Sequence, residues 1–174
     1  MDRFSEELGR IQQDLRFLDV KEVLSVIEKP TGNVYSFFLD YDRGVEDGIL
    51  AGNYDLVEKS IKFHDFQIKR EGARNIVAEL FHCNQYTWTD DVLCKIARRG
   101  RPADFLELLA FGEKYPMVQL EFPIVSLGSV FQGPCGKRFA PYLGREISKR
   151  SLSFGLFGNG WINSCRFLVI RDRE

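Results

Sequence analysis

Cysteine and histidine are the residues of this sequence best suited to nucleophilic or metal chemistry. The 174-residue chain has two histidines, His64 and His82, and four cysteines, at positions 83, 94, 135 and 165. The cysteines form no CxxC pair, and their spacing fits no zinc motif. His82 directly precedes Cys83, but adjacent residues of a helix or strand point in different directions, so this pair is no catalytic dyad. We interpret the cysteines as small core side chains, with a zinc site as the alternative.

Acidic residues are concentrated between Asp40 and Asp47, where they could bind a cation or form an active site together with the histidines. An EF-hand loop starting at Asp40 would need an oxygen ligand at its fifth position and glycine at its sixth. Gly44 and Val45 occupy those positions, so an exposed acidic loop is the simpler interpretation. GxSxG, Walker and HExxH motifs are also absent. The sequence therefore predicts a protein that is not an enzyme and has no cofactor and no metal site.

Arginines cluster in the segment Arg98-Arg99-Gly100-Arg101-Pro102, which contains a core like that of a minor-groove AT-hook. Helix patterns flank this segment, so the end of one helix and the start of the next explain the same residues. Residues 133–174 hold 8 basic and 3 acidic side chains, whereas residues 1–132 hold 16 and 22. A basic end on an acidic body can attract an anionic partner. A nucleic-acid-associated module that uses this basic end and residues 98–101 is therefore the alternative function.

The elements that must position these residues begin with apolar side chains at helical spacing from Phe4 to Leu18. Two β-rich runs within 23–41 flank turn residues and predict a hairpin. Glycines at 44, 48 and 52 indicate loops, and residues 54–62 allow a short helix. Three more helices are expected, because apolar residues share a face in each: Ile76, Val77, Leu80 and Phe81 in the first, Val92, Leu93, Ile96 and Ala97 in the second, and Phe105, Leu108 and Leu109 in the third.

Boundary residues complete this outline. Thr89 and Asp90 are expected to cap the second of these helices, and Pro102 to occupy the first turn of the third. From residue 117 the apolar period changes to two, which predicts strands over 118–122, 151–156 and 161–172. The whole pattern predicts an α+β fold with a C-terminal antiparallel sheet. We expect a single domain over 1–174, helix-rich over 1–116 and strand-rich over 117–174.

The start of the chain and its apolar runs bear on location. The first ten residues lack the apolar stretch of a signal peptide. No apolar run approaches the roughly 18 residues that a transmembrane helix needs. We therefore expect a protein that does not enter a membrane and that acts in the cytoplasm or on a virus particle.

The strand predicted over 151–156 has one face that the core does not dictate. Leu152, Phe154 and Leu156 share one side, while small residues occupy the other. Side chains that point away from a core, on a rigid backbone, are free to bind a ligand. An ordinary solvated strand face is the alternative interpretation.

A framework of residues spread along the chain resembles a known group of small microbial and viral proteins. The stretches 34–36 and 44–48 contribute to the resemblance near the start. Its C-terminal part comprises Glu121-Phe122-Pro123-Ile124-Val125, Leu127-Gly128-Ser129-Val130, Pro141, Leu143, Arg150-x-Leu152, Phe157, Gly160-Trp161 and Cys165-Arg166-Phe167. On these residues the chain resembles the variable proteins of diversity-generating retroelements, in which mutation of template adenines diversifies a ligand-binding surface.

The resemblance implies a C-type-lectin-like fold, with an N-terminal helix and hairpin, central helices and a C-terminal antiparallel sheet closed by the strand 167–171. It implies a non-enzymatic binding protein whose ligand is a protein or a cell-surface molecule. The EPN, QPD and WND motifs of calcium-dependent lectins are absent, which argues against calcium-dependent sugar binding. The basic residues nearby could add electrostatic attraction for a ligand; they are Lys137, Arg138, Arg145, Lys149 and Arg150. The implied variable positions are Tyr142, Ser151, Ser153, Gly155, Asn159, Ile162, Asn163 and Ser164.

Overall fold

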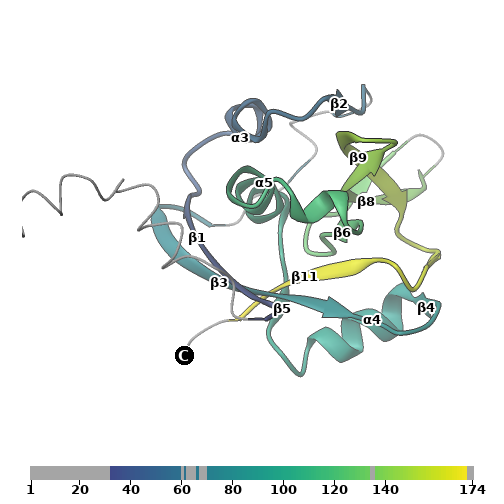
Figure 1. The fold of residues 1–174 in the computed structure, drawn as a ribbon. Coiled ribbons are helices and arrows are strands. Elements are labelled where there is room, and N and C mark those ends of the chain that lie inside the picture. Colours follow the sequence, from purple (N-terminus) through teal and green to yellow (C-terminus); the bar gives the residue numbers. More distant parts are fainter. Residues whose placement is uncertain (1–31, 60, 62–65, 67–69, 134–135, 172–174) are drawn as a thin grey trace, which may run out of the picture. The chain divides into compact units, whose positions relative to one another are not determined.

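The structure, a computed structural model, describes residues 32–59, 61, 66, 70–133 and 136–171 (Figure 1). Within these residues the fold is α+β, as predicted, and strands predominate. The elements are β1 (Val34–Asp40), α3 (Val45–Gly52), β2 (Leu56–Val57), β3 (Ala73–His82), β4 (Thr87–Trp88), α4 (Thr89–Ile96), β5 (Arg101–Pro102), α5 (Phe105–Lys114), the 3-10 helix η2 (Val118–Leu120), β6 (Ile124–Val125), β7 (Phe131–Gln132), β8 (Arg138–Glu146), β9 (Lys149–Leu156), β10 (Gly160–Trp161) and β11 (Arg166–Ile170).

One large sheet and one small sheet organise these strands. The large sheet has the order β1-β3-β11-β6-β8-β9-β2, with β5 paired to β11 and β7 paired to β8. The pairs β11–β6 and β2–β9 are parallel, and the remaining pairs are antiparallel. β4 and β10 form a separate antiparallel pair. The last strand of the described residues, β11, therefore lies inside the large sheet, between β3 and β6.

β11 is buried on both of its faces. Its residues Phe167, Leu168, Val169 and Ile170 are each at most 2% exposed. Leu168 and Ile170 belong to the hydrophobic cluster around α5, whereas Phe167 and Val169 belong to a second cluster beside α4. Because successive side chains of a strand alternate between faces, this apolar run builds a core on each side of the sheet. Figure 1 shows α5 and α4 on opposite sides of β3 and β11.

α5 is the helix at the centre of the larger cluster. Phe105, Leu108 and Phe111 are fully buried. A capping box begins the helix: the Asp104 carboxylate accepts the Glu107 N–H at 3.0 Å, and the Glu107 carboxylate accepts the Asp104 N–H at 2.7 Å. Asp104 is therefore the N-cap. Pro102, which was expected in the first turn, lies instead in β5.

The helix predicted over Ile76, Val77, Leu80 and Phe81 is wrong, because these residues belong to β3. β3 pairs with β1 on one side and β11 on the other. A strand in this position carries apolar side chains on both faces, and periodicity alone does not separate such a run from a buried helix.

Three other predictions, which were based on glycines or on short apolar runs, are wrong. Gly48 and Gly52 lie in a helix, α3, rather than in loops. A Cβ at Gly48 would lie 3.0 Å from Cδ1 of Leu109, so glycine permits close approach of α3 to α5. The described residues of 54–62 contain the strand β2 in place of a helix. The alternation over 118–122 corresponds to the 3-10 helix η2 rather than a strand.

Other predicted elements are confirmed with adjusted ends. β1, α4, α5 and β9 lie where strands and helices were expected. Thr89 is the first residue of α4 rather than its cap, and Trp88 takes the N-cap position. The final strand predicted over 161–172 divides, within the described residues, into β10 and β11. The predicted helix over 4–18 and the first hairpin strand lie outside the described residues, and the described partner of β1 is β3. None of the described helices is long and apolar enough to span a bilayer.

Candidate functional site

The eight positions implied as variable fall into two groups, one within the β8–β9 pair and one after β9. Ser151, Ser153 and Gly155 lie within β9, opposite the strand β8 that carries Tyr142. The second group follows β9, in the turn before β10 and the loop after it. We call residues 159–164 the display loop. The structure therefore does not gather all eight positions on one surface.

The first group is built into the packing of the sheet. Ser151 is 4% exposed, and its carbonyl oxygen accepts a hydrogen bond from Nε2 of the buried Gln119 at 3.1 Å. A Cβ at Gly155 would lie 2.8 Å from Cη2 of Trp161. Tyr142 is half-buried against the cluster beside α4. These three positions are constrained by neighbours and are not free surface.

Ser153 is half-buried and pairs with Tyr142 across the β8–β9 register. Together with Ser151 it lines a pocket of about 250 Å³ beside β2. The charged residues of this pocket are Glu58, Lys59 and Glu146. Charges of both signs surround the two serines, so the pocket favours no single class of charged ligand.

The second group is exposed. Asn159, Asn163 and Ser164 lie at the surface, and Ile162 is 59% exposed. The backbone of this loop is nevertheless held at several points. Nε2 of His82 lies 2.6 Å from the carbonyl oxygen of Asn163, and the N–H of Cys165 donates to the carbonyl of Ile162 at 3.1 Å.

Thr89 and Trp161 anchor the start of the display loop. The Thr89 hydroxyl donates to the carbonyl oxygen of Phe157 and lies 2.9 Å from that of Asn159. It accepts the indole N–H of Trp161 at 2.9 Å. Trp161 is 9% exposed and packs edge-on against Phe167, with ring centroids 6.0 Å apart. A fixed scaffold thus carries a loop in which the side chains of Asn159, Ile162, Asn163 and Ser164 are exposed.

An exposed aromatic pair lies beside this loop. Tyr86 is 54% and Trp88 56% exposed, and their rings meet edge to face at 5.7 Å. Trp88 pairs with Gly160 in the β4–β10 sheet, and the Tyr86 ring covers the space where a Gly160 side chain would lie. We call Tyr86, Trp88 and Ile162 the aromatic patch.

Sequence reasoning missed Tyr86 and Trp88. Their alternation around Thr87, which is 4% exposed, is the strand signal that could have placed both aromatic rings on one exposed face.

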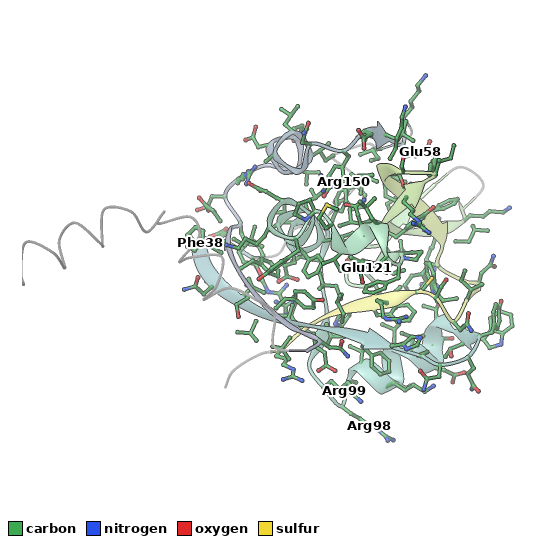
Figure 2. All side chains as sticks on the ribbon, in the orientation of Figure 1. Phe38, Glu58, Arg98, Arg99, Glu121 and Arg150 are labelled. Carbon is green, nitrogen blue, oxygen red and sulfur yellow. The ribbon has the colours of Figure 1, made fainter. Side chains whose placement is uncertain are left out.

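One of the basic residues expected to attract a ligand, Arg150, serves the fold instead. The Arg150 guanidinium donates to the carbonyl oxygens of Gly52 at 2.7 Å and Gly112 at 2.8 Å, near the C-terminal ends of α3 and α5. The guanidinium carbon of Arg150 also lies 4.9 Å from the ring centroid of Tyr54. Figure 2 shows Arg150 among the helices rather than at the edge of the molecule. The Arg138 guanidinium lies 4.7 Å from the centroid of the Phe157 ring.

The other four basic residues of that set are exposed at the surface: Lys137, Arg138, Arg145 and Lys149.

The arginine segment between α4 and β5 is divided by its contacts. Arg98 and Arg99 extend from the surface beside the end of α4 (Figure 2). Arg99 pairs with Glu79 at 2.9 Å. The Arg101 guanidinium instead makes two hydrogen bonds, of 2.6 and 2.9 Å, to the fully buried Glu107. This pairing and the β5 ladder hold the segment, so it does not present the extended arginine series of an AT-hook.

The candidate chemical residues are dispersed. Cys83 and Cys165 are buried and Cys94 is exposed, and all three are free thiols. Burial raises the pKa of the Cys165 thiol, so it is poorly suited to act as a thiolate. Within the part of the chain that the structure describes, no cluster of three His, Cys, Asp or Glu side chains could hold a metal ion. His64 and Cys135 lie outside the described residues.

The Asp40 carboxylate accepts a hydrogen bond from the backbone N–H of Asp42 at 3.0 Å. The Asp42 carboxylate accepts one from the backbone N–H of Gly72 at 3.2 Å. Glu46 and Asp47 lie in the first turn of α3, where negative charge favours the helix dipole. The acidic segment therefore has a structural role in its loop and helix.

Comparisons with known proteins identify no relative of this chain. No protein-family model matches the chain, and no curated protein and no solved structure is significantly similar to it. The assignment of function therefore depends on the site itself.

Proposed function

We propose that this chain is a non-enzymatic binding protein that presents the display loop and the aromatic patch to a protein ligand. One observation carries the proposal: exposed side chains project from a loop whose backbone is fixed by Thr89, Trp161 and His82. A rigid backbone lowers the entropy that a binding surface loses when it meets its ligand.

The aromatic patch supports a protein as the ligand. Tyr and Trp are enriched at protein–protein interfaces, where their rings supply a large contact area with few rotatable bonds. Trp88 and Ile162 are both more than half exposed, so each retains apolar area that a partner can bury. The side chains of Asn159, Asn163 and Ser164 can supply hydrogen bonds around this apolar area.

The finer proposal is that the display loop is diversified by a retroelement on a C-type-lectin-like scaffold. Its support is the resemblance of the framework residues and the exposure of four implied positions in one loop: Asn159, Ile162, Asn163 and Ser164. Ser151, Gly155 and Tyr142 have packing roles, so we restrict the proposed variable surface to the display loop.

A display library tests the proposal. Asn159, Ile162, Asn163 and Ser164 would be randomised together, the variants displayed on yeast, and folded clones selected for binding to hen lysozyme as a defined protein probe. We expect mostly folded clones, and binders whose affinity falls at least tenfold when Trp88→Ser is added. Few folded clones, or binders indifferent to Trp88, would contradict the proposal.

The matched control library randomises Tyr142, Ser151, Ser153 and Gly155. We expect a much smaller folded fraction there, because a side chain at position 155 collides with Trp161. Equal folded fractions in the two libraries would show that the display loop tolerates randomisation no better than the positions in β8 and β9.

A further inference from the structure

Besides the pocket next to β2, the described residues form a pocket at the end of β3 and β11 that is opposite the display loop. A pocket of about 210 Å³ is lined by Arg70, Arg74, Arg101 and Arg171, together with one asparagine and three aliphatic side chains. Arg74 lies at the start of β3 and Arg171 follows β11, whereas His82 and Arg166, beside the display loop, lie at the opposite ends of these strands. The pocket is therefore independent of the proposed function.

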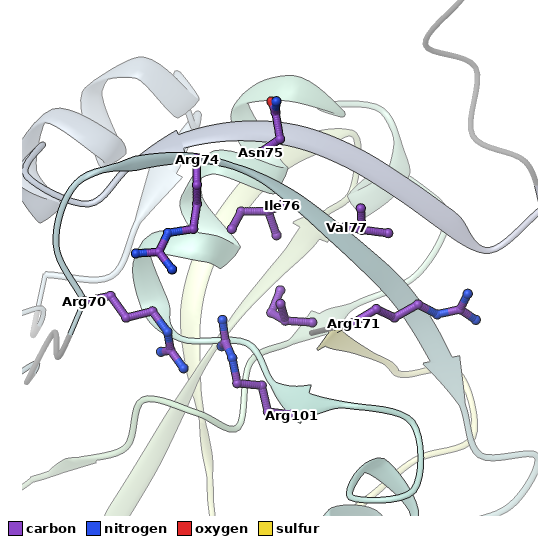
Figure 3. Close-up of a pocket in the computed structure, with 8 residues that line it drawn as sticks. Arg70, Arg74, Asn75, Ile76, Val77, Arg101 and Arg171 are labelled. Carbon is purple, nitrogen blue, oxygen red and sulfur yellow. The ribbon is translucent and has the colours of Figure 1, made fainter. Parts of the chain in front are cut away.

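Positive charge dominates the pocket. Among the described residues that line it, four are arginines and none is acidic. Figure 3 shows Arg70, Arg74 and Arg101 directed toward one side of the pocket, and Arg171 directed away from them. We call Arg70, Arg74 and Arg101 the arginine cradle.

Carboxylates neutralise this group only in part. Arg101 pairs with the buried Glu107, and Arg70 lies 3.4 Å from Oδ2 of Asp104. Arg74 makes no ion pair with any carboxylate of the described residues; its guanidinium donates to the carbonyl oxygen of Glu71 at 3.0 Å. Arg74 thus brings to the cradle a guanidinium group that no carboxylate of the described residues neutralises.

The cradle is also held in place before any ligand binds. Tyr41 contributes twice, because its hydroxyl donates to Glu107, which fixes Arg101, and its ring lies 5.2 Å from the Arg74 guanidinium carbon. The bidentate pairing of Arg101 with Glu107 sets the plane of its guanidinium. Arginines ordered in this way lose little entropy when they bind an anion.

We propose that the arginine cradle binds a phosphate group, as inorganic phosphate or as the phosphate of a small monoester. Guanidinium groups match the geometry of phosphate oxygens through paired hydrogen bonds. A volume of about 210 Å³ is below the roughly 300 to 1,000 Å³ typical of pockets for drug-sized molecules. It suits one compact anionic group. A nucleic-acid backbone would instead require positive charge along an extended track.

Phosphate titration at constant ionic strength tests this site. Sodium phosphate would replace sodium chloride at about pH 7 while the melting temperature and the amide spectrum of the ¹⁵N-labelled full-length protein are followed. We expect the melting temperature to rise with phosphate and saturate, with amide shifts concentrated at Asn75 and Arg171. Equal melting temperatures in phosphate and chloride would overturn the proposal.

Arg74→Gln is the decisive variant, because Arg74 is exposed and its loss leaves the core intact. We expect it to weaken phosphate binding at least tenfold, while Arg145→Gln, which removes an exposed arginine outside the pocket, leaves it unchanged. Phosphate binding that survives Arg74→Gln would overturn the assignment to the cradle.

Two further arms identify the source of the phosphate. A small monoester such as glycerol phosphate should compete with inorganic phosphate. If a 20-base-pair DNA duplex binds at low salt, that binding should be the same in the parent and in Arg74→Gln. If Arg74→Gln abolishes DNA binding, and phosphate does not raise the melting temperature of the parent, the proposal is overturned in favour of a nucleic-acid site.

Discussion

The Trp161 indole N–H donates to the Thr89 hydroxyl at 2.9 Å, and this bond joins two residues that are 72 positions apart in the sequence. The same hydroxyl donates to the carbonyl oxygen of Phe157. One buried side chain therefore ties the start of α4 to the turn that precedes the display loop. This bond holds the backbone at the base of the display loop.

Thr89→Val should remove that tie without changing the side-chain shape. Trp161 Nε1 and the Phe157 carbonyl then lose a buried partner, and each unsatisfied group costs about 1 to 3 kcal/mol. We expect a free energy of unfolding lower by about 2 kcal/mol or more, measured by urea denaturation. Thr87→Val is the control, because the Thr87 hydroxyl donates only to the nearby Gln85 carbonyl. Equal losses in the two variants would contradict the anchoring role of Thr89.

Gly155→Asn should destabilise the protein although asparagine belongs to the implied variable set. Its Cβ would meet the Trp161 ring at 2.8 Å, and overpacking of this kind costs about 1 to 3 kcal/mol. Ser164→Asn, in the exposed loop, should stay within about 0.5 kcal/mol of the parent. Thermal melting of the two variants compares them directly. A stable Gly155→Asn variant would return position 155 to the variable surface.

Arg150→Lys should destabilise the protein although the charge is kept. Lysine cannot reproduce the fork that donates to the carbonyls of Gly52 and Gly112. Hydrogen bonds to a charged group are worth about 1.5 to 3 kcal/mol, so a loss of about 2 kcal/mol is expected in urea denaturation. Arg145→Lys, at an exposed position, should leave stability unchanged. An unchanged midpoint for Arg150→Lys would refute the structural role of Arg150.

Asp104 should make stability depend on pH. Burial, followed by the negative charge of Glu107, raises the pKa of Asp104 to about 6, while Arg101 and Arg70 oppose the shift. Between about pH 4 and pH 6 the folded chain then holds a proton that the unfolded chain has released, so protonation of this group stabilises the fold as pH falls. Asp104→Asn keeps the helix cap but removes this titration.

The measurement is urea denaturation of the parent and Asp104→Asn at about pH 7, 6 and 5. The stability of the parent relative to the variant should increase as the pH is lowered across this range. A difference that is constant with pH, or that changes in the opposite direction, would show that Asp104 is not the titrating group.

Local patterns predicted part of the fold. α4, α5 and β9 were predicted from their apolar spacing, although the expected boundary residues Thr89 and Pro102 do not have the predicted positions. β3 was not, because a strand covered on both faces carries the apolar run of a buried helix. α3 was missed because Gly48 permits a close contact with Leu109, which only the tertiary structure shows.

The sites depended even more on contacts distant in sequence. The exposure of Ile162 and Asn163 followed the sequence expectation, but Ser151 is buried, and its carbonyl oxygen is bonded to Gln119, which lies 32 residues away. The arginine cradle had no sequence signal, since Arg70 and Arg101 come from different segments that meet only in the fold.

The central claim, that the display loop is a variable ligand surface, is tested most directly by sequencing the genomic region around the gene. The account predicts a second, near-identical copy of the 3′ coding segment close to a reverse-transcriptase gene. Differences between the copies should be confined to template adenines and should fall mainly in the codons for Asn159, Ile162, Asn163 and Ser164. The absence of such a copy, or differences concentrated in the codons for residues 142–155, would contradict the claim.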